Sequence, residues 1–349
     1  MPAERYRAAI IGCGGIGRAH AGAYRQVGVP IAAVADVREE GLAAFGERYG
    51  VEARYRDYRA LLAEQRPEIV SVCTWPPLHE EMVLEAAAAG ARAVVCEKPL
   101  TLSLASADRM IEACRAAGAL LVVGHQRRYG SHWRLAREWI SEGAIGPLER
   151  IDVSIGGDLL SDGVHGLNLA QFWSGDAAAA WVIGQIDRPA GAAMPPPEAG
   201  TRAAAGWRYG HVVEAGAVLT AGLHSGVTIH LESGNVRQTK PYIDIVAIGA
   251  QGLVRATTDG VCLKVGPAGR CEQHFEHAEG LATFSAEMRD VVRCLDGELS
   301  EHPLDVKYHR PALELALGAY VSARRRGRIP LPLTDEGFPL AEMIAAGEI

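Results

Sequence analysis

The sequence feature that most constrains the fold is a glycine-rich turn near the N-terminus. The apolar run from Ala8 to Ile11 ends at Gly12 and passes directly into a helical pattern. Gly12, Gly14 and Gly17 have the spacing GxGxxG, in which the first glycine permits a tight turn, the second admits a close backbone approach and the third lets the helix pack on the strand. The sequence therefore predicts a strand, a tight turn and a helix whose first amides point at an anion.

A second predicted strand, Ile31 to Asp36, ends in an acidic residue nineteen positions after Gly17. In dinucleotide-binding sheets a carboxylate at this place binds the hydroxyls of the adenosine ribose. Asp36 would repel the 2′-phosphate of NADP, whereas Arg38 could attract it, so the sequence favours NAD over NADP. A glycine-rich turn in some other α/β unit is the alternative interpretation. The predicted cofactor contacts in this part of the chain are Gly12, Gly14, Gly15, Ile16, Gly17, Asp36 and Arg38.

Strands and helices continue to alternate up to residue 124. The strands predicted after Asp36 are Ala53–Tyr55, Ile69–Cys73, Ala93–Cys96 and Leu120–Gly124, and the helices between them are Gly41–Tyr49, a helix capped by Asp57, Glu80–Ala89 and Ser103–Ala117. Continuous apolar runs are typical of parallel strands that are buried on both faces. Six strands joined by five crossovers predict a doubly wound parallel sheet, a Rossmann domain over residues 1–124.

Polar and aromatic residues follow the fourth and fifth predicted strands. The turn 74–79 comes after Ile69–Cys73, and Glu97-Lys98-Pro99 comes after Ala93–Cys96. The carboxyl ends of parallel strands meet where a doubly wound sheet binds its ligand. Pro99 disfavours a helical Lys98, so we expect the ammonium group at the strand tip. Trp75 fits a pocket wall and the core equally well. The further predicted cofactor contacts are Thr74, Trp75, Pro76, His79, Glu97, Lys98 and Gln126.

The pattern changes after Gly124, where longer strands separated by short turns begin. The predicted strands are Leu148–Ile155, Ala179–Ile186, Val212–Leu219, Val227–Glu232, Tyr242–Ile248, Leu253–Thr257 and Val261–Val265, and the closing helices are Thr283–Leu295 and Val306–Arg325. They predict an α+β domain over residues 125–349 with an open, largely antiparallel sheet. The stretch from Asp187 to Tyr209 lacks periodicity and is expected to be a mobile loop over the site or at an interface.

A histidine-bearing segment lies between the first two long strands of this second domain. His165 and Asn168 are one helical turn apart, away from an apolar stripe on the same predicted helix, and Asp162 precedes them. A lone histidine on a helix is usually structural. Here the glycine-bounded helix start and the nearby carboxylate favour an imidazole that is presented to a cleft and tuned there. His211 and Glu214, after the long loop, are weaker candidates for lining the same pocket, and Arg127 and Tyr129 for contacting substrate.

Taken together, these motifs resemble those of the Gfo/Idh/MocA oxidoreductase family, which includes glucose-fructose oxidoreductase and inositol dehydrogenase. The resemblance is carried by the GxGxxG turn, Asp36, Glu97-Lys98-Pro99 and the pattern GxHxxN around His165. It implies that Lys98 and His165 face the nicotinamide from opposite domains. It also implies a sugar, amino sugar, sugar acid or cyclitol as substrate, and a homodimer or homotetramer built through the second-domain sheets.

The chain departs from the family pattern at the histidine segment. The usual pattern is DxGxHxxD, whereas this chain has Ser161 at the first position, an aspartate shifted by one to Asp162, and Asn168 at the last position. The resemblance therefore leaves the carboxylate partner of His165 open, and it does not single out one substrate.

The chemistry of hydride transfer supports the same residues. Removing a hydride from a secondary alcohol requires that its hydroxyl proton be removed as well, and histidine titrates in the right range to accept it. Lys98 would stabilise the developing alkoxide, and Asn168 would orient a hydroxyl. Two alternatives fit the same residues: a glycoside-cleaving enzyme that oxidises its substrate transiently with retained NAD, and a nucleotide-sensing regulator without catalysis.

Composition narrows the class of partner. The net charge is −7 and the isoelectric point about 6.0, which disfavours a nucleic-acid partner. The sequence has neither an apolar stretch of membrane-spanning length nor the architecture of a signal peptide at its start. Seven cysteines without a CxxC pair are expected to be reduced core thiols of a cytoplasmic protein, with no metal site.

Overall fold

The computed structural model describes residues 5–187, 203–204, 206–234, 241–266, 270–274, 280–334 and 337–349. The chain divides into two compact units. The first comprises residues 1–101, 105–126 and 279–306, and the second comprises residues 102–104, 127–278 and 307–349. The helix at 281–295 thus groups with the first unit, whereas the boundary that we drew at residue 124 assigned it to the second. Most of the expected loop, residues 188–202, lies outside the described residues.

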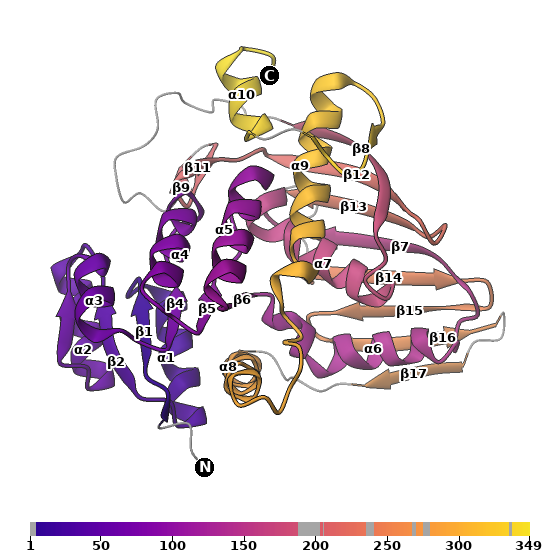
Figure 1. Cartoon of the computed structure of the whole chain (residues 1–349). Coiled ribbons are helices and arrows are strands. Elements are labelled where there is room, and N and C mark those ends of the chain that lie inside the picture. Colours follow the sequence, from indigo (N-terminus) through magenta and orange to yellow (C-terminus); the bar gives the residue numbers. More distant parts are fainter. Residues whose placement is uncertain are drawn as a thin grey trace. The chain divides into compact units, whose positions relative to one another are not determined.

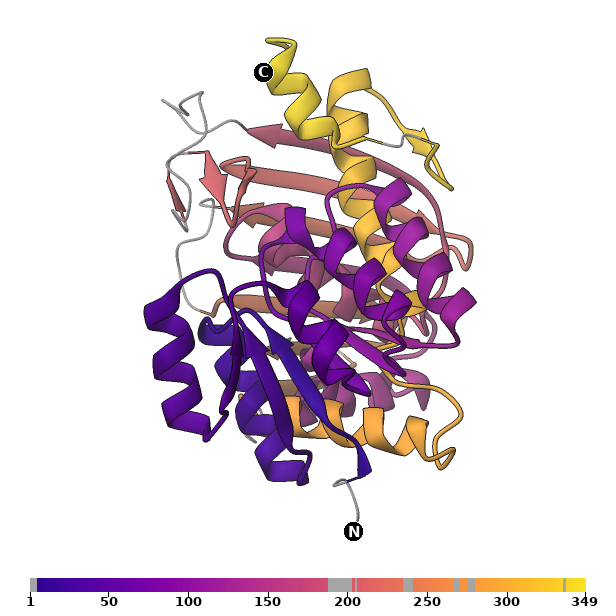
Figure 2. The same cartoon turned by 60° about the vertical axis from the view of Figure 1, so that its left-hand side comes forward.

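The first unit is built on a six-stranded parallel sheet in the order β3-β2-β1-β4-β5-β6 (Figure 1). This is the strand order of a dinucleotide-binding sheet, so the predicted fold is confirmed. Figure 2 shows the indigo strands of this sheet running side by side. The strands are β1 (Ala8–Ile11), β2 (Ile31–Ala35), β3 (Ala53–Tyr55), β4 (Ile69–Val72), β5 (Ala93–Cys96) and β6 (Leu120–Val123), and the helices are α1 (Gly15–Val27), α2 (Glu39–Tyr49), α3 (Tyr58–Gln65), α4 (His79–Ala88), α5 (Leu104–Ala117) and α8 (Leu281–Leu295).

Local chemistry explains where these elements start and stop. Every residue of β1, β4 and β5 is buried, as the continuous apolar runs predict. The carboxylate of Asp57 accepts a hydrogen bond from the backbone N–H of Arg59 at 2.9 Å, which confirms the predicted cap of α3. α1 ends at Gly28, whose φ of 75° lies in the left-handed region that glycine adopts without strain.

The second unit contains a nine-stranded sheet in the order β17-β16-β15-β14-β7-β13-β12-β8-β18. Among the described residues only the pair β7–β13 is parallel, which confirms an open, largely antiparallel sheet. Its strands are β7 (Leu148–Ile155), β8 (Ala179–Asp187), β12 (Gly216–Leu223), β13 (Thr228–Gly234), β14 (Ile243–Gly249), β15 (Gly252–Thr257), β16 (Gly260–Val265), β17 (Arg270–His274) and β18 (Ile329–Pro330), and its helices are α6 (Ser131–Ser141), α7 (Val164–Trp173), α9 (Arg310–Arg325) and α10 (Pro339–Ala345).

Two predicted elements of this unit were wrong in their bounds. The strand expected at Val212–Leu219 starts only at Gly216, because the chain first forms a small sheet from β9 (Ala203–Ala204), β10 (Trp207–Arg208) and β11 (His211–Val212) and then buries Glu214. The helix expected at Val306–Arg325 is a 3₁₀ turn followed by α9. Pro311 stands in the first turn of α9, where its missing N–H costs nothing.

The histidine-bearing helix α7 is buried along its whole length. It lies against β7 and β13 at Gly166, where an added Cβ would come within 2.6 Å of Val153 Cγ1. At its other end the indole Nε1–H of Trp173 donates to the backbone carbonyl of Trp133 at 3.0 Å. α7 is therefore fixed on the sheet by close packing.

Among the described residues, no helix is long and apolar enough to cross a membrane.

We predict that Gly166→Ala lowers the free energy of unfolding by about 1–3 kcal/mol, because the new methyl group displaces α7 from the sheet. Urea unfolding followed by circular dichroism measures it. Gly41→Ala in α2 is the control, since its Cβ would meet only the Arg38 side chain at 3.7 Å. That substitution should be neutral or stabilise by up to about 1 kcal/mol. A Gly166→Ala variant as stable as the wild type would contradict the close packing.

Candidate functional site

The turn between β1 and α1 depends on two glycines for its shape. Gly12 has a φ of 105°, and a Cβ there would lie 2.5 Å from the carbonyl oxygen of Cys73. A Cβ at Gly17 would collide with the carbonyl oxygen of Gly12. In contrast, a Cβ added at Gly14 or Gly15 would meet nothing within 4 Å among the described residues. The backbone at the start of α1 is therefore open to a ligand, as the motif predicts.

The carboxylate of Asp36 is fixed at the end of β2 by two backbone donors. Its Oδ2 accepts from the N–H of Cys13 at 2.8 Å, and its Oδ1 accepts from the N–H of Arg38 at 2.9 Å. The Arg38 guanidinium is largely exposed, with its Nε 3.6 Å from Oδ1. A carboxylate has about four acceptor positions, so two remain for the hydroxyls of a ribose.

His79 joins the turns that follow β4 and β5. Its ring is fully buried, with Nδ1 3.1 Å and 3.0 Å from the carbonyl oxygens of Pro99 and Leu100, and Nε2 3.2 Å from that of Thr74. Burial lowers its pKa, and hydrogen bonds to these carbonyls oppose that shift. These polar contacts of His79 are all with backbone carbonyls, which suits a residue that holds the two turns in place. Its direct contact with a cofactor stays a prediction.

The other predicted cofactor contacts of the first unit lie at the same edge of the sheet. Thr74 and Trp75 are half-buried, and Pro76 is buried. Gln126 follows β6, and its Oε1 is buried without a hydrogen-bond donor in the part of the chain that the structure describes. A buried carbonyl oxygen without a donor is costly, so a ligand N–H at this place would stabilise it.

Lys98 follows β5 directly and is half-buried. The preceding Glu97 is buried, and its carboxylate accepts from the Lys98 backbone N–H at 3.2 Å and from His20 Nε2 at 3.0 Å. Gly124 leaves the space for this carboxylate, since a Cβ there would lie 2.7 Å from Glu97 Oε1. Lys98 belongs to the first unit.

In the second unit, a π-helical turn (Leu159–Gly163) leads into α7. Asp158 caps this turn, because its Oδ1 accepts from the backbone N–H of Ser161 at 2.7 Å. Its Oδ2 pairs with Arg208 at 3.0 Å, and the same guanidinium pairs with Asp162. Asp162, which we predicted to tune His165, is therefore an ion-pair partner of Arg208.

Sequence reasoning missed both Asp158 and Arg208. Asp158 carried a signal, since an acidic residue three positions before Ser161 and at the start of a helical turn is typical of an N-cap. Arg208 carried none, because it lies at the end of the stretch without periodicity.

His165 and Asn168 are both buried in α7. The carboxamide of Asn168 is engaged at both ends: its Oδ1 accepts from Arg128 Nε at 2.7 Å, and its Nδ2 donates to the carbonyl of Tyr308 at 2.8 Å. Arg128 also pairs with Asp176 at 2.6 Å. Asn168 thus anchors α7 within its unit, and its expected contact with a substrate hydroxyl stays a prediction.

Glu214 holds the start of the π-helical turn. Its buried carboxylate accepts from the backbone N–H of Leu159 at 2.5 Å and from the Tyr320 hydroxyl at 2.8 Å. Burial, and next the charge of Asp158, raise its pKa to about 7. His211 is buried nearby, with Nδ1 2.9 Å from the carbonyl of Val212 and Nε2 3.5 Å from the Ser161 hydroxyl, and burial lowers its pKa.

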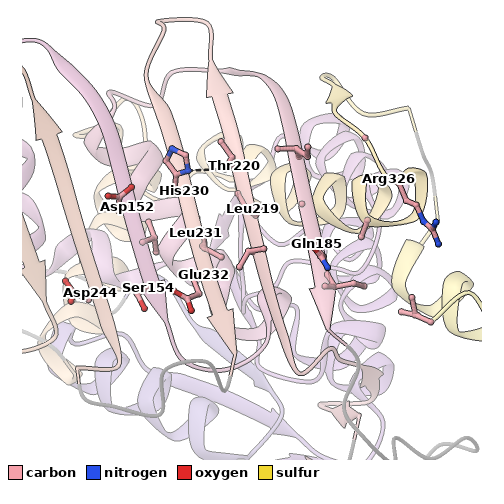
Figure 3. Close-up of a pocket in the computed structure, with 18 of the residues that line it drawn as sticks. Asp152, Ser154, Gln185, Leu219, Thr220, His230, Leu231, Glu232, Asp244 and Arg326 are labelled. Carbon is pink, nitrogen blue, oxygen red and sulfur yellow. Dashed lines mark hydrogen bonds between the residues drawn. The ribbon is translucent and has the colours of Figure 1, made fainter.

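The outer face of the nine-stranded sheet carries a broad groove of about 1130 Å³ (Figure 3). Asp152, Glu232 and Asp244 lie over its central strands, and Arg326 lies on the opposite side at the end of α9. Within the groove, Thr220 Oγ1 and His230 Nδ1 are 3.0 Å apart. Ile183 and Val218 line the same groove and are 44% and 48% exposed.

Among the described residues, no group of three or more His, Cys, Asp or Glu side chains is arranged to hold a metal ion.

We predict that the stability difference between wild type and Glu214→Gln depends on pH. The folded protein binds a proton at Glu214 up to about pH 7, whereas the unfolded chain releases it near 4.5. This contribution is complete below 4.5 and is lost as pH rises through 7, by on the order of 1–3 kcal/mol. Urea unfolding of both proteins between pH 5 and 8 measures it, with the exposed Glu47→Gln as control. A difference that does not change with pH would contradict the assignment.

Comparisons with known proteins agree with this geometry. Residues 6–125 match the model of the Gfo/Idh/MocA family, described as an oxidoreductase family with an NAD-binding Rossmann fold. The chain is 34% identical over 191 residues to D-apiose dehydrogenase of Paraburkholderia graminis, which covers 50% of this chain and 51% of that protein. It is also 34% identical over 186 residues to myo-inositol 2-dehydrogenase of Thermotoga maritima, which covers 49% and 55%.

The match to these curated relatives spans about half of their length. The fold is similar over nearly the whole chain to a solved NAD-binding oxidoreductase from Klebsiella pneumoniae, with a TM-score of 0.79, 19% identity, and coverage of 95% of this chain and 100% of the other. The open glycine turn, the fixed Asp36 carboxylate and the family match all fall in the same region. Residues 6–125 of this chain therefore match the Gfo/Idh/MocA oxidoreductase family in sequence and in the geometry of the dinucleotide-binding turn.

Proposed function

We propose that the protein is an NAD-dependent oxidoreductase that interconverts a secondary alcohol and a ketone in a sugar, amino sugar or cyclitol. The observation that carries this proposal is the Asp36 carboxylate, held by two backbone donors beside the open start of α1. The names of the relatives, which are dehydrogenases of apiose and of inositol, support the substrate class.

The residues of the first unit fit NAD. The backbone from Gly14 to Ile16 would bind the pyrophosphate, and Asp36 would bind the ribose hydroxyls. At the other end, the buried and unsatisfied Oε1 of Gln126 suits the amide N–H of a nicotinamide. NAD supplies the hydride acceptor of the reaction when it is bound.

His165 and Lys98 would both act on the substrate oxygen, one by proton transfer and the other by charge stabilisation. In the proposed mechanism, the imidazole of His165 takes the hydroxyl proton as general base and returns it in the reverse reaction. The ammonium of Lys98 donates to the same oxygen and stabilises the negative charge that develops there. Since Asp158, Asp162 and Asn168 contact other groups of their own unit, we propose that they hold α7 in place.

Substitution of the two proposed catalytic residues tests this function. His165→Asn and Lys98→Met should each lower kcat by about 10²–10⁴-fold, because one removes the base and the other the charge on the oxygen. The affinity for NAD should change less than about threefold. The exposed residues His224 and Lys264 offer matched controls, and His224→Asn and Lys264→Met should have wild-type rates.

The assay is reduction of NAD or NADP, followed at 340 nm, with a panel of sugars, inositols and amino sugars. Wild-type turnover in either catalytic variant would overturn that residue's assignment. Protein that purifies with bound nucleotide and releases reducing sugar without net absorbance change would identify the glycoside-cleaving alternative instead.

We also infer that copies of the chain associate through the groove face of the nine-stranded sheet. Two exposed apolar side chains, Ile183 and Val218, lie beside acidic residues and an arginine on this face. Apolar groups framed by charges are typical of a protein interface.

Light scattering tests the association. The wild type should have a mass that is a multiple of 37.1 kDa, and the double variant Ile183→Lys, Val218→Lys should have the mass of one chain. Leu78→Lys, an exposed apolar position in the first unit, is the control and should keep the wild-type mass. A monomeric wild type would overturn the inference.

A further inference from the structure

In the first unit, a buried series of hydrogen-bonded polar side chains leads to Glu97, the residue before Lys98. The Tyr24 hydroxyl lies 2.7 Å from the Ser71 hydroxyl, which lies 3.0 Å from His20 Nδ1, and His20 Nε2 lies 3.0 Å from Glu97 Oε1. All four side chains are buried. They come from α1, from β4 and from the end of β5, so these hydrogen bonds join a helix to two strands of the sheet.

The direction of these hydrogen bonds follows from chemistry. Burial raises the pKa of Tyr24, so its phenol stays protonated and donates to Ser71. Ser71 then donates to Nδ1 of His20, and Nε2–H donates to the carboxylate of Glu97. If Nδ1 of His20 carried a proton, it would donate to Ser71 instead, and the Ser71 hydroxyl would then accept twice and lose the acceptor of its own proton. Every hydrogen bond in this series therefore has a donor when the His20 proton is on Nε2.

The carboxylate of Glu97 has little freedom to move. Its Oε1 accepts from His20 and its Oε2 accepts from the backbone N–H of Lys98, in the space that Gly124 leaves open by having no Cβ. A carboxylate fixed on two sides in turn fixes the peptide that carries Lys98.

We propose that His20 is a positioning residue: it places Lys98 by holding the carboxylate of Glu97. This inference rests on the proposed function, since it assigns His20 a part in placing the ammonium that works on the substrate oxygen. His20 is far from Lys98 in sequence and was not among the site residues predicted from the motifs.

Burial favours the uncharged forms of three side chains that interact with Glu97. Glu287 of α8 is fully buried, and neither of its carboxyl oxygens has a hydrogen-bond partner among the described residues. Burial, and next the charge of Glu97, raise its pKa well above the usual value, so it stays protonated. The thiols of Cys73 and Cys96 also interact electrostatically with Glu97, and burial raises their pKa.

His79 is a further titratable group that interacts with Glu97, and burial lowers its pKa. In general, a carboxylate charge close to an amine favours the ammonium form of that amine. If Glu97 loses its donor, a buried carboxylate is left incompletely satisfied and protonates more readily. Loss of the His20 hydrogen bond should therefore reach Lys98 as a lower pKa.

Titration of Lys98 in cofactor-free protein gives a readout that does not depend on activity. The chain has only four lysines, Lys98, Lys240, Lys264 and Lys307, so reductive ¹³C-methylation gives few signals and Lys98→Arg assigns the one of interest. His20→Leu and Glu97→Gln should each lower the Lys98 titration midpoint by about one pH unit. His20→Gln keeps a donor toward Glu97 and should stay close to the wild type. An unshifted midpoint in both His20→Leu and Glu97→Gln would overturn the proposal.

Kinetics of the same variants provide the second readout. His20→Leu should lower kcat about 10–100-fold and move the alkaline limb of its pH profile to lower pH, while KM for NAD changes less than about threefold. His20→Gln should restore kcat to within about threefold. Equal losses in both variants, with the wild-type pH profile, would show that His20 only supports the fold and would overturn the proposal.

Two further variants keep the test decisive. Ser71→Ala serves if His20→Leu does not fold, because it removes the donor to Nδ1 and leaves the imidazole in place. It should lower the Lys98 titration midpoint by less than His20→Leu would, and an unshifted midpoint would overturn the proposal. Lys98→Met separates the two levels of inference. If Lys98→Met is inactive while His20→Leu behaves as wild type, only the role of His20 is wrong, whereas an active Lys98→Met overturns the proposed function itself.

Discussion

The close packing of α1 on β1 is the constraint on which the rest of the first unit depends. A side chain at Gly17 would collide with the carbonyl of Gly12, and one at Gly12 would strike the backbone of Cys73. Because no side chain intervenes, the start of α1 lies against the carboxyl ends of β1 and β4. Backbone donors then reach Asp36 on one side, and on the other His20 reaches Ser71 and Glu97.

The second unit uses buried charge for a similar purpose. The turn before α7 is held by Asp158 and Glu214, and Arg208 ties Asp158 and Asp162 to the small sheet that precedes β12. Buried charges are tolerated only when they are paired or hydrogen-bonded. α7 is thus fixed by packing at Gly166 and by polar contacts at its start, which is what a residue such as His165 requires if it is to act in a defined orientation.

The parts of the fold that could be predicted from the sequence are those coded by local patterns. The glycine spacing, the apolar runs and the cap at Asp57 each lie within a few residues, and the corresponding elements are confirmed. Contacts between distant residues left no such pattern. Arg208 meets Asp162 across 46 positions, and Arg128 meets Asn168 across 40. The sequence therefore placed the candidate residues on their elements but could not assign their partners.

The central claim is that Asp36 makes the first unit a site for NAD. Isothermal titration calorimetry of nucleotide-free protein with NAD⁺ and with NADP⁺ tests it most directly. We expect NAD⁺ to bind at least about tenfold more tightly, because a carboxylate fixed at the ribose repels a 2′-phosphate. Equal affinities for the two dinucleotides, or no binding of either, would contradict it.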